Sequence, residues 1–352
     1  MEKNDFGIIL DTPSKNKIWC MLMINNINYN NISLNLVALG FKNKKIVLIN
    51  LSIMKIHQEI DTEGEVYSLA QFKNDPNYLI CSLSNGTMII YLLKDNIYYH
   101  YQTLQKPEGN VKEEFNKVIV LSDGNLATAE SRAISIWKSN LKAENKKFEF
   151  FKEIITGNDT CQLVEVNPQI IACAMYDTKL INIYIKKGDD YSLLKTLSNI
   201  ENHGNNSNSM AKINDKLFCC GGKKGVIYII SIEPIQVIKK INLDKLGKYD
   251  DKSFIQFLHN SNDGFIFTSF NDVIFQFKII YDKKGNFIDV KEYNVIEDGE
   301  NNEAIITNEY GEIFYKKKIN HYYYDEIFLV LKNYYIKKKY NLKSKLGKFI
   351  KF

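Results

Sequence analysis

The chain has 352 residues, of which 45% are hydrophobic and 25% charged, and its formal net charge is +5. This length is enough to bury a large core, and no apolar run approaches the roughly 18 residues that a membrane-spanning helix needs. The N-terminal segment MEKNDFGIILDTPSKNK is too polar for a secretory signal. We therefore expect a soluble, cytoplasmic protein.

The cysteines lie in apolar runs, without the CxxC spacing or neighbouring histidines of a metal site. Buried, reduced thiols are the expectation for such positions. The sequence therefore predicts no metal, no cofactor and no disulfide framework. The six residues are Cys20, Cys81, Cys161, Cys173, Cys219 and Cys220.

A two-strand unit recurs along the chain. Each copy has an apolar strand, a short polar turn and a second strand that ends on an anchor, mostly aromatic or aliphatic. Subtracting successive anchor numbers gives 42, 46, 47, 46, 47 and 39. A near-constant period of this length predicts an array of repeated supersecondary units. The anchors are Ile49, Tyr91, Trp137, Tyr184, Ile230, Phe277 and Lys316.

Two further strands are predicted around most copies. An alternating apolar run precedes the pair, and a more polar run follows it, as expected for the solvated edge of a sheet. The preceding runs are Ile18–Ile24, Val66–Phe72, Phe115–Leu121, Cys161–Val166, Met210–Ile213 and Phe254–Leu258. The following runs are Tyr98–Leu104, Phe148–Ile155, Leu193–Leu197 and Val237–Ile241.

The clearest copy, GNLATAESRAISIWK from Gly124 to Lys138, resembles the WD40 core pattern G-x-L-A-T-A-S-x-D-x-x-I-x-I-W-D. The resemblance covers residues 5–318 and implies an all-β, seven-bladed β-propeller of four-stranded antiparallel blades. Trp137-Lys138 replaces the family's Trp-Asp, and the chain has no Gly-His dipeptide. The family's Asp-His-Ser/Thr-Trp hydrogen-bond set is therefore not expected here.

The seventh unit is shorter than the others. Its first strand is expected near Tyr293–Ile296, and its second and third strands in AIITNEYGEIFYKK. Its last strand is not evident in the sequence that follows. The N-terminal run Phe6–Leu10 is the candidate to pair there, which would join the two chain ends in one blade and close the ring.

The C-terminus departs from the repeat, so residues 1–318 are predicted as the propeller and 319–352 as a basic, aromatic extension. Residues 316–352 hold eleven lysines against Asp325 and Glu326, a net charge of +9 that leaves about −4 for the remainder. Tyr322–Tyr324 could supply a last strand, and from Asp325 onward a helix is predicted.

The end of this extension has the pattern of a short, basic amphipathic helix. Three interpretations stay open: a docking helix for a partner protein, a stabilising extension, and an arm for a membrane surface or nucleic acid. The apolar positions at i, i+4, i+7 and i+8 are Leu342, Leu346, Phe349 and Ile350.

The resemblance implies that the turns between the second and third strands lie on one rim of the propeller, where partners bind. Their charges have mixed signs, which argues against a polyanionic ligand. The candidate protein-binding residues are Lys42, Lys44, Asn85, Glu130, Arg132, Asp177, Lys223, Lys224, Asn271, Asp272 and Glu309.

No motif points to catalysis. Gly221–Gly225 lacks the spacing of a phosphate-binding loop, and the five histidines fall at different phases of the repeat. Arg132 is the only arginine, and the Phe-Arg-Arg-Gly motif of phosphoinositide-binding propellers is absent. Specific nucleic-acid recognition also loses support without arginine.

We therefore predict a non-enzymatic scaffold that presents rim loops and a basic arm to partner proteins, within a multi-protein complex and without nucleic acid. One alternative is a peripheral membrane adaptor that binds through the extension. The other is a hydrolase that uses the central channel of the propeller.

Overall fold

The structure is a computed structural model. It describes residues 7–330 except for 11–17, 30–31, 52, 54, 73–74, 76, 108–113, 141–146, 177, 201–208, 223–224, 244–254, 261–263, 271–272, 298–301, 308–312 and 320–323.

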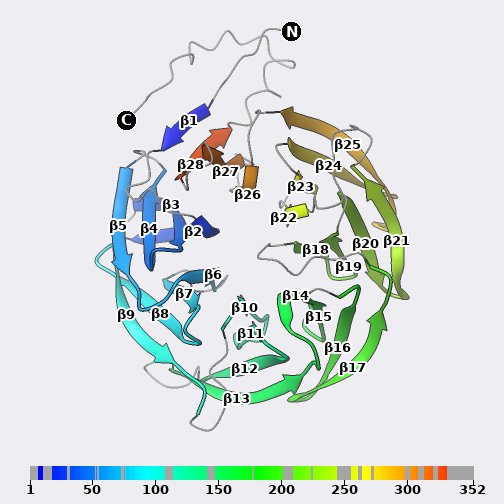
Figure 1. Ribbon diagram of the computed structural model, residues 1–352, viewed down its shortest axis with the longest axis horizontal. Helices are drawn as coiled ribbons and strands as arrows, with labels where there is room; N and C mark the ends of the chain where they lie inside the picture. Colours follow the sequence, from blue (N-terminus) through cyan, green and yellow to red (C-terminus); the bar gives the residue numbers. More distant parts are fainter. Residues whose placement is uncertain are drawn as a thin grey trace.

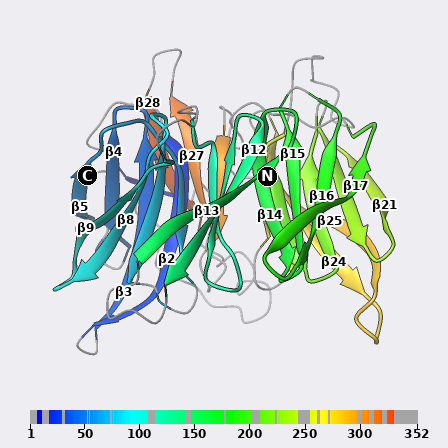
Figure 2. The same ribbon diagram turned by 90° about the horizontal axis from the view of Figure 1, so that it is seen from below.

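Seven four-stranded antiparallel sheets are arranged as blades around a common axis (Figure 1). The first strand of each blade lies nearest the axis and the fourth lies outermost. Seen from the side, the blades form a thick disc whose strands run between its two faces (Figure 2). The predicted seven-bladed β-propeller is confirmed. None of the described segments is a helix long and apolar enough to cross a membrane.

Six blades are contiguous in sequence. Blade one has β2 (Ile18–Tyr29), β3 (Ile32–Phe41), β4 (Lys45–Asn50) and β5 (Lys55–Asp61). Blade two has β6 (Val66–Gln71), β7 (Tyr78–Leu83), β8 (Met88–Lys94) and β9 (Ile97–Leu104). Blade three has β10 (Lys117–Val120), β11 (Leu126–Glu130), β12 (Ala133–Asn140) and β13 (Lys147–Ile155).

The next three follow the same order. Blade four has β14 (Thr160–Asn167), β15 (Ile170–Met175), β16 (Ile181–Lys187) and β17 (Asp190–Leu197). Blade five has β18 (Met210–Asn214), β19 (Leu217–Gly221), β20 (Val226–Ile232) and β21 (Ile235–Asn242). Blade six has β22 (Ile255–Asn260), β23 (Phe265–Phe270), β24 (Val273–Tyr281) and β25 (Phe287–Glu297).

Burial follows the predicted order of polarity. Every residue of the second strands β7, β15 and β19 is buried, whereas seven of the eight residues of the outermost strand β17 are at least partly exposed. The apolar cores lie between successive blades, where each sheet packs on its neighbour. The anchors Tyr91, Trp137 and Tyr184 are buried in these cores, as the repeat requires.

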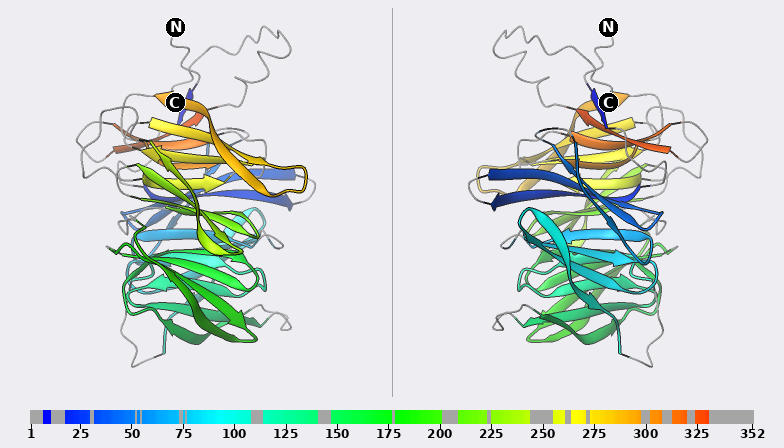
Figure 3. Two further views of the ribbon diagram at one scale, coloured as in Figure 1. Left: turned by 90° about the vertical axis from the view of Figure 1, so that its right-hand side faces the viewer. Right: turned by 90° about the vertical axis from the view of Figure 1, so that its left-hand side faces the viewer.

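The seventh blade joins the two ends of the chain. It has β26 (Asn302–Thr307), β27 (Ile313–Ile319), β28 (Tyr324–Val330) and, outermost, β1 (Gly7–Leu10). Strand β1 pairs with β28 from Gly7 opposite Val330 to Leu10 opposite Ile327. Figure 3 shows β1 beside the C-terminal strands. The predicted closure of the ring by the N-terminal run is confirmed.

The predicted phase of this blade was wrong by one strand. Tyr293–Ile296 lies in β25, the outer strand of blade six. AIIT lies in β26 and IFYKK in β27, so they are the first and second strands and Lys316 is not a third-strand anchor. The third strand is β28, and the helix predicted from Asp325 onward is wrong as far as Val330.

The propeller therefore continues past the predicted boundary at residue 318. Strand β28 pairs along its length with β27, from Ile319 opposite Tyr324 to Ile313 opposite Val330. Residues 331–352, including the predicted amphipathic helix, lie outside the described residues.

A chain of inter-blade clasps runs around the outer strands. In blades one to five, the outer-strand residue paired with the position before the anchor sits at a β-bulge. Each of these residues bonds to the outer strand of the next blade. We name them the belt residues: Gln58, Gln102, Lys152, Lys195 and Lys239.

The belt uses two kinds of bond. The amide of Gln102 donates to Phe148 O at 2.8 Å and accepts from Phe148 N at 3.0 Å, and Gln58 bonds Tyr98 in the same two-way manner. The lysines use single contacts, such as Lys239 Nζ to Asp289 Oδ1 at 2.8 Å. Each glutamine thus bonds both the N–H and the C=O of one residue in the neighbouring outer strand. These paired bonds fix how the two adjacent blades are positioned along each other.

Candidate functional site

The rim predicted for binding carries some of its candidate residues in exposed turns. Lys42 and Lys44 lie in the turn between β3 and β4, and Asn85 lies between β7 and β8. Asn85 is exposed, and its side-chain oxygen accepts from Thr87 N and Oγ1. Arg132 is exposed between β11 and β12. Outside the described residues lie Asp177, Lys223, Lys224, Asn271, Asp272, Glu309, Leu342, Leu346, Phe349 and Ile350.

Glu130 is not a rim contact, which corrects the prediction. Its side chain is fully buried at the end of β11 and forms an ion pair with Lys106, which also pairs with Glu153. Thr128 Oγ1 donates to Glu130 at 2.8 Å, and Trp137 Nε1 donates to Thr128 at 3.2 Å. Burial raises the pKa of Glu130, and the bonds from Lys106 and Thr128 oppose that rise.

This buried chain shows that part of the WD40 hydrogen-bond set is present after all. Trp137 and Thr128 form the Trp–Thr bond of the family pattern in blade three. Beyond them Glu130 and Lys106 continue the network in place of the family's acid and histidine. The sequence motif does not reveal this network, because a glutamate and a lysine stand where the family pattern has an aspartate and a histidine.

A second group of side chains gathers at the rim ends of the innermost strands β2 and β6. Trp19 Nε1 donates to Glu65 Oε2 at 3.1 Å, and the rings of Trp19 and Tyr67 meet edge to face with centroids 5.8 Å apart. The hydroxyl of Tyr67 bonds to Glu114, which precedes β10. We call Trp19, Glu65, Tyr67 and Glu114 the mouth cluster.

The mouth cluster is acidic around its rings. Burial raises the pKa of Tyr67 to about 12, and the charges of Glu114 and Glu65 add to the rise. The phenol is therefore neutral at physiological pH, and both carboxylates lie within electrostatic reach of it. Two half-buried rings and two carboxylates offer a site for a cation.

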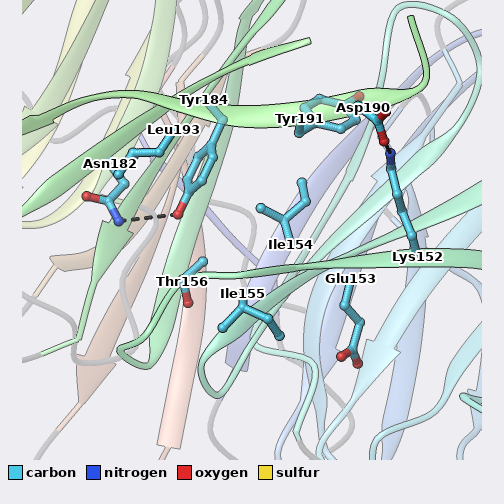
Figure 4. A pocket seen from close by; sticks show the side chains of 10 residues that line it. All are labelled: Lys152, Glu153, Ile154, Ile155, Thr156, Asn182, Tyr184, Asp190, Tyr191 and Leu193. Atoms are coloured by element: carbon cyan, nitrogen blue, oxygen red, sulfur yellow. Dashed lines mark hydrogen bonds and ion pairs between the residues drawn. The ribbon is translucent and has the colours of Figure 1, made fainter. Parts of the chain in front are cut away.

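A groove of about 350 Å³ opens between the outer strands of blades three and four. Figure 4 shows Ile154 of β13 between the rings of Tyr184 and Tyr191 from blade four. The residues that line it are Lys152, Glu153, Ile154, Ile155, Thr156, Asn182, Tyr184, Asp190, Tyr191 and Leu193.

Apolar and polar side chains both line the groove. Ile155 of β13 and Leu193 of β17 are 71% and 54% exposed. The ion pair of Lys152 with Asp190, at 2.6 Å, closes one end. At the other end Asn182 bonds to Tyr184 at 3.3 Å.

The polar groups of the groove are largely satisfied within the chain. Burial raises the pKa of Tyr184 to about 12, so its phenol stays neutral. Glu153 pairs with Lys106, and Asp190 pairs with Lys152. The groove therefore combines apolar side chains with polar groups that are already bonded within the chain, which suits a peptide segment with aliphatic side chains.

The described residues contain no candidate metal site. Within them no three His, Cys, Asp or Glu side chains lie close enough to hold an ion. All six cysteines are unpaired and buried, and burial raises the pKa of Cys20, Cys161 and Cys219 to about 12. Their burial is as predicted, and it disfavours the reactive thiolate form.

No protein-family model matches the sequence, and no curated protein matches it. Solved structures do. The WD40 β-propeller domain of Doa1 superposes with a TM-score of 0.63 at 13% identity, covering 93% of this chain and 98% of that one. The chain has the WD40 β-propeller fold.

Two other structures agree with this WD40 fold. U3-55K superposes with a TM-score of 0.70 at 10% identity, covering 92% of this chain and 98% of that one. The β-propeller domain of Cps50 (Swd1) from Myceliophteria thermophila gives 0.65 at 10% identity, covering 92% and 100%. At these identities the likeness defines the fold alone.

Sequence patterns missed both the groove and the mouth cluster. The groove depends on which face of an outer strand carries Ile155 and Leu193, and the weak alternation of these strands does not fix it. The mouth cluster joins residues one repeat apart, since Trp19 and Glu65 are separated by 46 positions. A search for matched positions in successive repeats could have found it.

Proposed function

We propose that this protein is a non-enzymatic, cytoplasmic scaffold that binds partner proteins on the surface of its propeller. The observation that carries the proposal is the groove between blades three and four, with the aliphatic side chains of Ile155 and Leu193 exposed in its walls. Exposed aliphatic side chains beside a groove give a docked segment apolar surface to bury. The unpaired, buried cysteines support a reducing compartment.

The test compares partners retained by the wild-type chain with those retained by Ile155→Asp, analysed by affinity purification and mass spectrometry. A carboxylate in the groove wall should abolish retention of any protein docked there, because a charge would be desolvated without a partner. Ile53→Asp is the matched control, since Ile53 is 61% exposed in blade one, away from the groove. Equal retention by all three chains contradicts the proposal.

The basic C-terminal segment is proposed as a second contact. Residues 331–352 contain eight lysines and no acidic residue, with Leu342, Leu346, Phe349 and Ile350 at helical spacing. We propose that this arm binds an acidic surface of a partner within a complex. A chain that ends at residue 330 tests it, because ending at 318 would remove β28.

The truncated chain should keep groove-dependent partners and lose those that the arm recruits. Liposome flotation with anionic vesicles separates the membrane alternative from the protein one. Loss of vesicle binding on truncation would favour a membrane adaptor. Unchanged retention of every partner would remove the arm from the account and leave the groove as the contact.

A further inference from the structure

The mouth cluster presents aromatic faces beside acidic groups. Trp19 and Tyr67 meet at an interplanar angle of 77°, and an edge-to-face pair leaves the faces of the edge-on ring uncovered by its partner. Both rings are only partly buried. A cation above such a ring is attracted by the negative potential of its face.

The two carboxylates are positioned by the rings and keep accepting capacity. Glu65 uses Oε2 for the indole N–H of Trp19, and its backbone N–H donates to Ser84 Oγ at 3.0 Å, which fixes the residue at the start of β6. Glu114 accepts the hydroxyl of Tyr67 and is otherwise exposed. A carboxylate has room for about four hydrogen bonds, so each retains free lone pairs.

No described cation neutralises these carboxylates. Among the described residues, the lysine nearest in sequence to Glu114 is Lys117, whose pKa burial lowers to about 8 and whose charge interacts with Cys20. Lys45, at the same rim, pairs with Glu59 at 3.1 Å and Asp61 at 3.6 Å. Among the residues that the structure describes, Glu65 and Glu114 thus form two negative charges without an ion-pair partner.

We propose that the mouth cluster binds a basic side chain, the guanidinium or ammonium group of an arginine or lysine of a partner protein. This rests on the proposed scaffold function and adds the chemistry of the contact. The cation lies against the rings of Trp19 and Tyr67, and its N–H groups donate to Glu65 and Glu114. Arginine fits better than lysine, because its planar fork can stack and bond at once.

Tryptophan fluorescence reports on this site directly. The chain has two tryptophans: Trp137 is fully buried, whereas Trp19 is partly exposed within the cluster. The purified full-length chain is titrated with the N-acetyl amides of arginine, lysine and citrulline, the last being the neutral isostere of arginine. We expect saturable changes in emission with the arginine and lysine amides, half-complete at millimolar concentrations, and no saturation with citrulline amide.

Charge-removing variants show which groups bind. Glu65→Gln keeps an oxygen acceptor for Trp19 Nε1 but loses the charge, and we expect about tenfold weaker binding of the arginine amide. Glu114→Gln should act in the same direction. Glu63→Gln is the control. It removes an exposed charge from the loop between β5 and β6, outside the mouth cluster, and should leave the titration unchanged. Trp137→Phe should keep the signal.

Two results overturn the inference: citrulline amide titrating like arginine amide, or the Glu65→Gln/Glu114→Gln chain binding as wild type does. The scaffold proposal is judged separately, by partner retention in the Ile155→Asp chain. A protein that retains groove-dependent partners but ignores the basic amides would remain a scaffold without this contact. A protein that binds the amides but retains no groove-dependent partner would keep the cation site and lose the groove.

Discussion

Blade three and the belt hold the propeller together in opposite ways. At blade three, the side chains of Trp137, Thr128 and Glu130 form one network with Lys106, which lies in the segment between blades two and three. The belt repeats a modest contact at five successive blade interfaces near the surface. Losing a bond of the buried network should be costly, because it leaves a polar group buried without a partner, whereas the belt distributes its stabilisation over many small bonds.

Removing the cation of the buried network should have the largest effect. Lys106→Met leaves Glu130 buried without its counter-charge, and we expect a loss of about 3 kcal/mol in the free energy of unfolding, measured by urea denaturation at pH 7. The double variant Lys106→Met/Glu130→Gln should recover most of the loss. If the single variant were as stable as wild type, the buried network would not be a main source of stability in blade three.

The same variant should show a pH dependence of known sign. Without Lys106, the pKa of Glu130 in the folded state rises further above its unfolded value, because burial penalises the charge. Protonation then favours the folded chain, so the deficit relative to wild type should shrink as the pH falls from 8 to 5. Denaturation at the two pH values measures it, and a deficit that grows on acidification contradicts the assignment.

Trp137→Phe tests the other end of the network. It keeps an aromatic ring in the core and removes the indole N–H that Thr128 accepts, so we expect a loss of about 2 kcal/mol in unfolding free energy. Thermal and urea denaturation measure it. Thr128→Val in the same background should add a further loss, because it also removes the hydroxyl that donates to the buried carboxylate of Glu130.

A belt glutamine should matter less than either. Gln102→Leu removes the two bonds to the backbone of Phe148, and we expect a loss of about 1 kcal/mol because the released groups can reach water. Gln102→Glu is the comparison: it keeps the acceptor for Phe148 N, loses the donor and turns a charged oxygen toward Phe148 O. A loss as large as that of Lys106→Met would erase the contrast between the two regions.

The smallest change is expected for a belt lysine. Lys239 and Asp289 form an ion pair in which both side chains are more than one third exposed. Lys239→Met should leave the denaturation midpoint unchanged within error at physiological salt, where such pairs are screened. A clear destabilisation would mean that the belt works through charge and not through its backbone-bonding glutamines.

Blades one to six could be predicted because their anchors recur at a near-constant spacing and are apolar. In the structure each anchor occupies a buried position next to a β-bulge. Trp137 and Tyr184 are examples. The seventh blade was placed one strand out of phase because only its first two strands resemble the repeat. The spacing of 39 residues between Phe277 and Lys316, shorter than the other spacings of 42 to 47, already indicated that Lys316 is not an equivalent anchor.

The candidate sites were harder to predict than the fold. Glu130 was read as a turn residue from its charge, although Lys106, more than twenty positions earlier, makes its burial tolerable. In the sequence Ile155 and Leu193 resemble ordinary strand residues. The hydrophobic pattern shows which residues of a strand share a face, but it does not show which neighbouring blade that face meets. Long-range pairing of this kind has no local signature in a single sequence.

The most direct test of the central claim is site-specific photo-crosslinking in cells. Leu193 is replaced by p-benzoyl-phenylalanine, with Ile53 replaced in a parallel chain as a control of similar exposure. The account predicts a crosslinked partner at position 193 that is absent at position 53 and is lost when Ile155→Asp is introduced across the groove. Identical crosslinks at both positions, or a crosslink at 193 indifferent to Ile155→Asp, would contradict it.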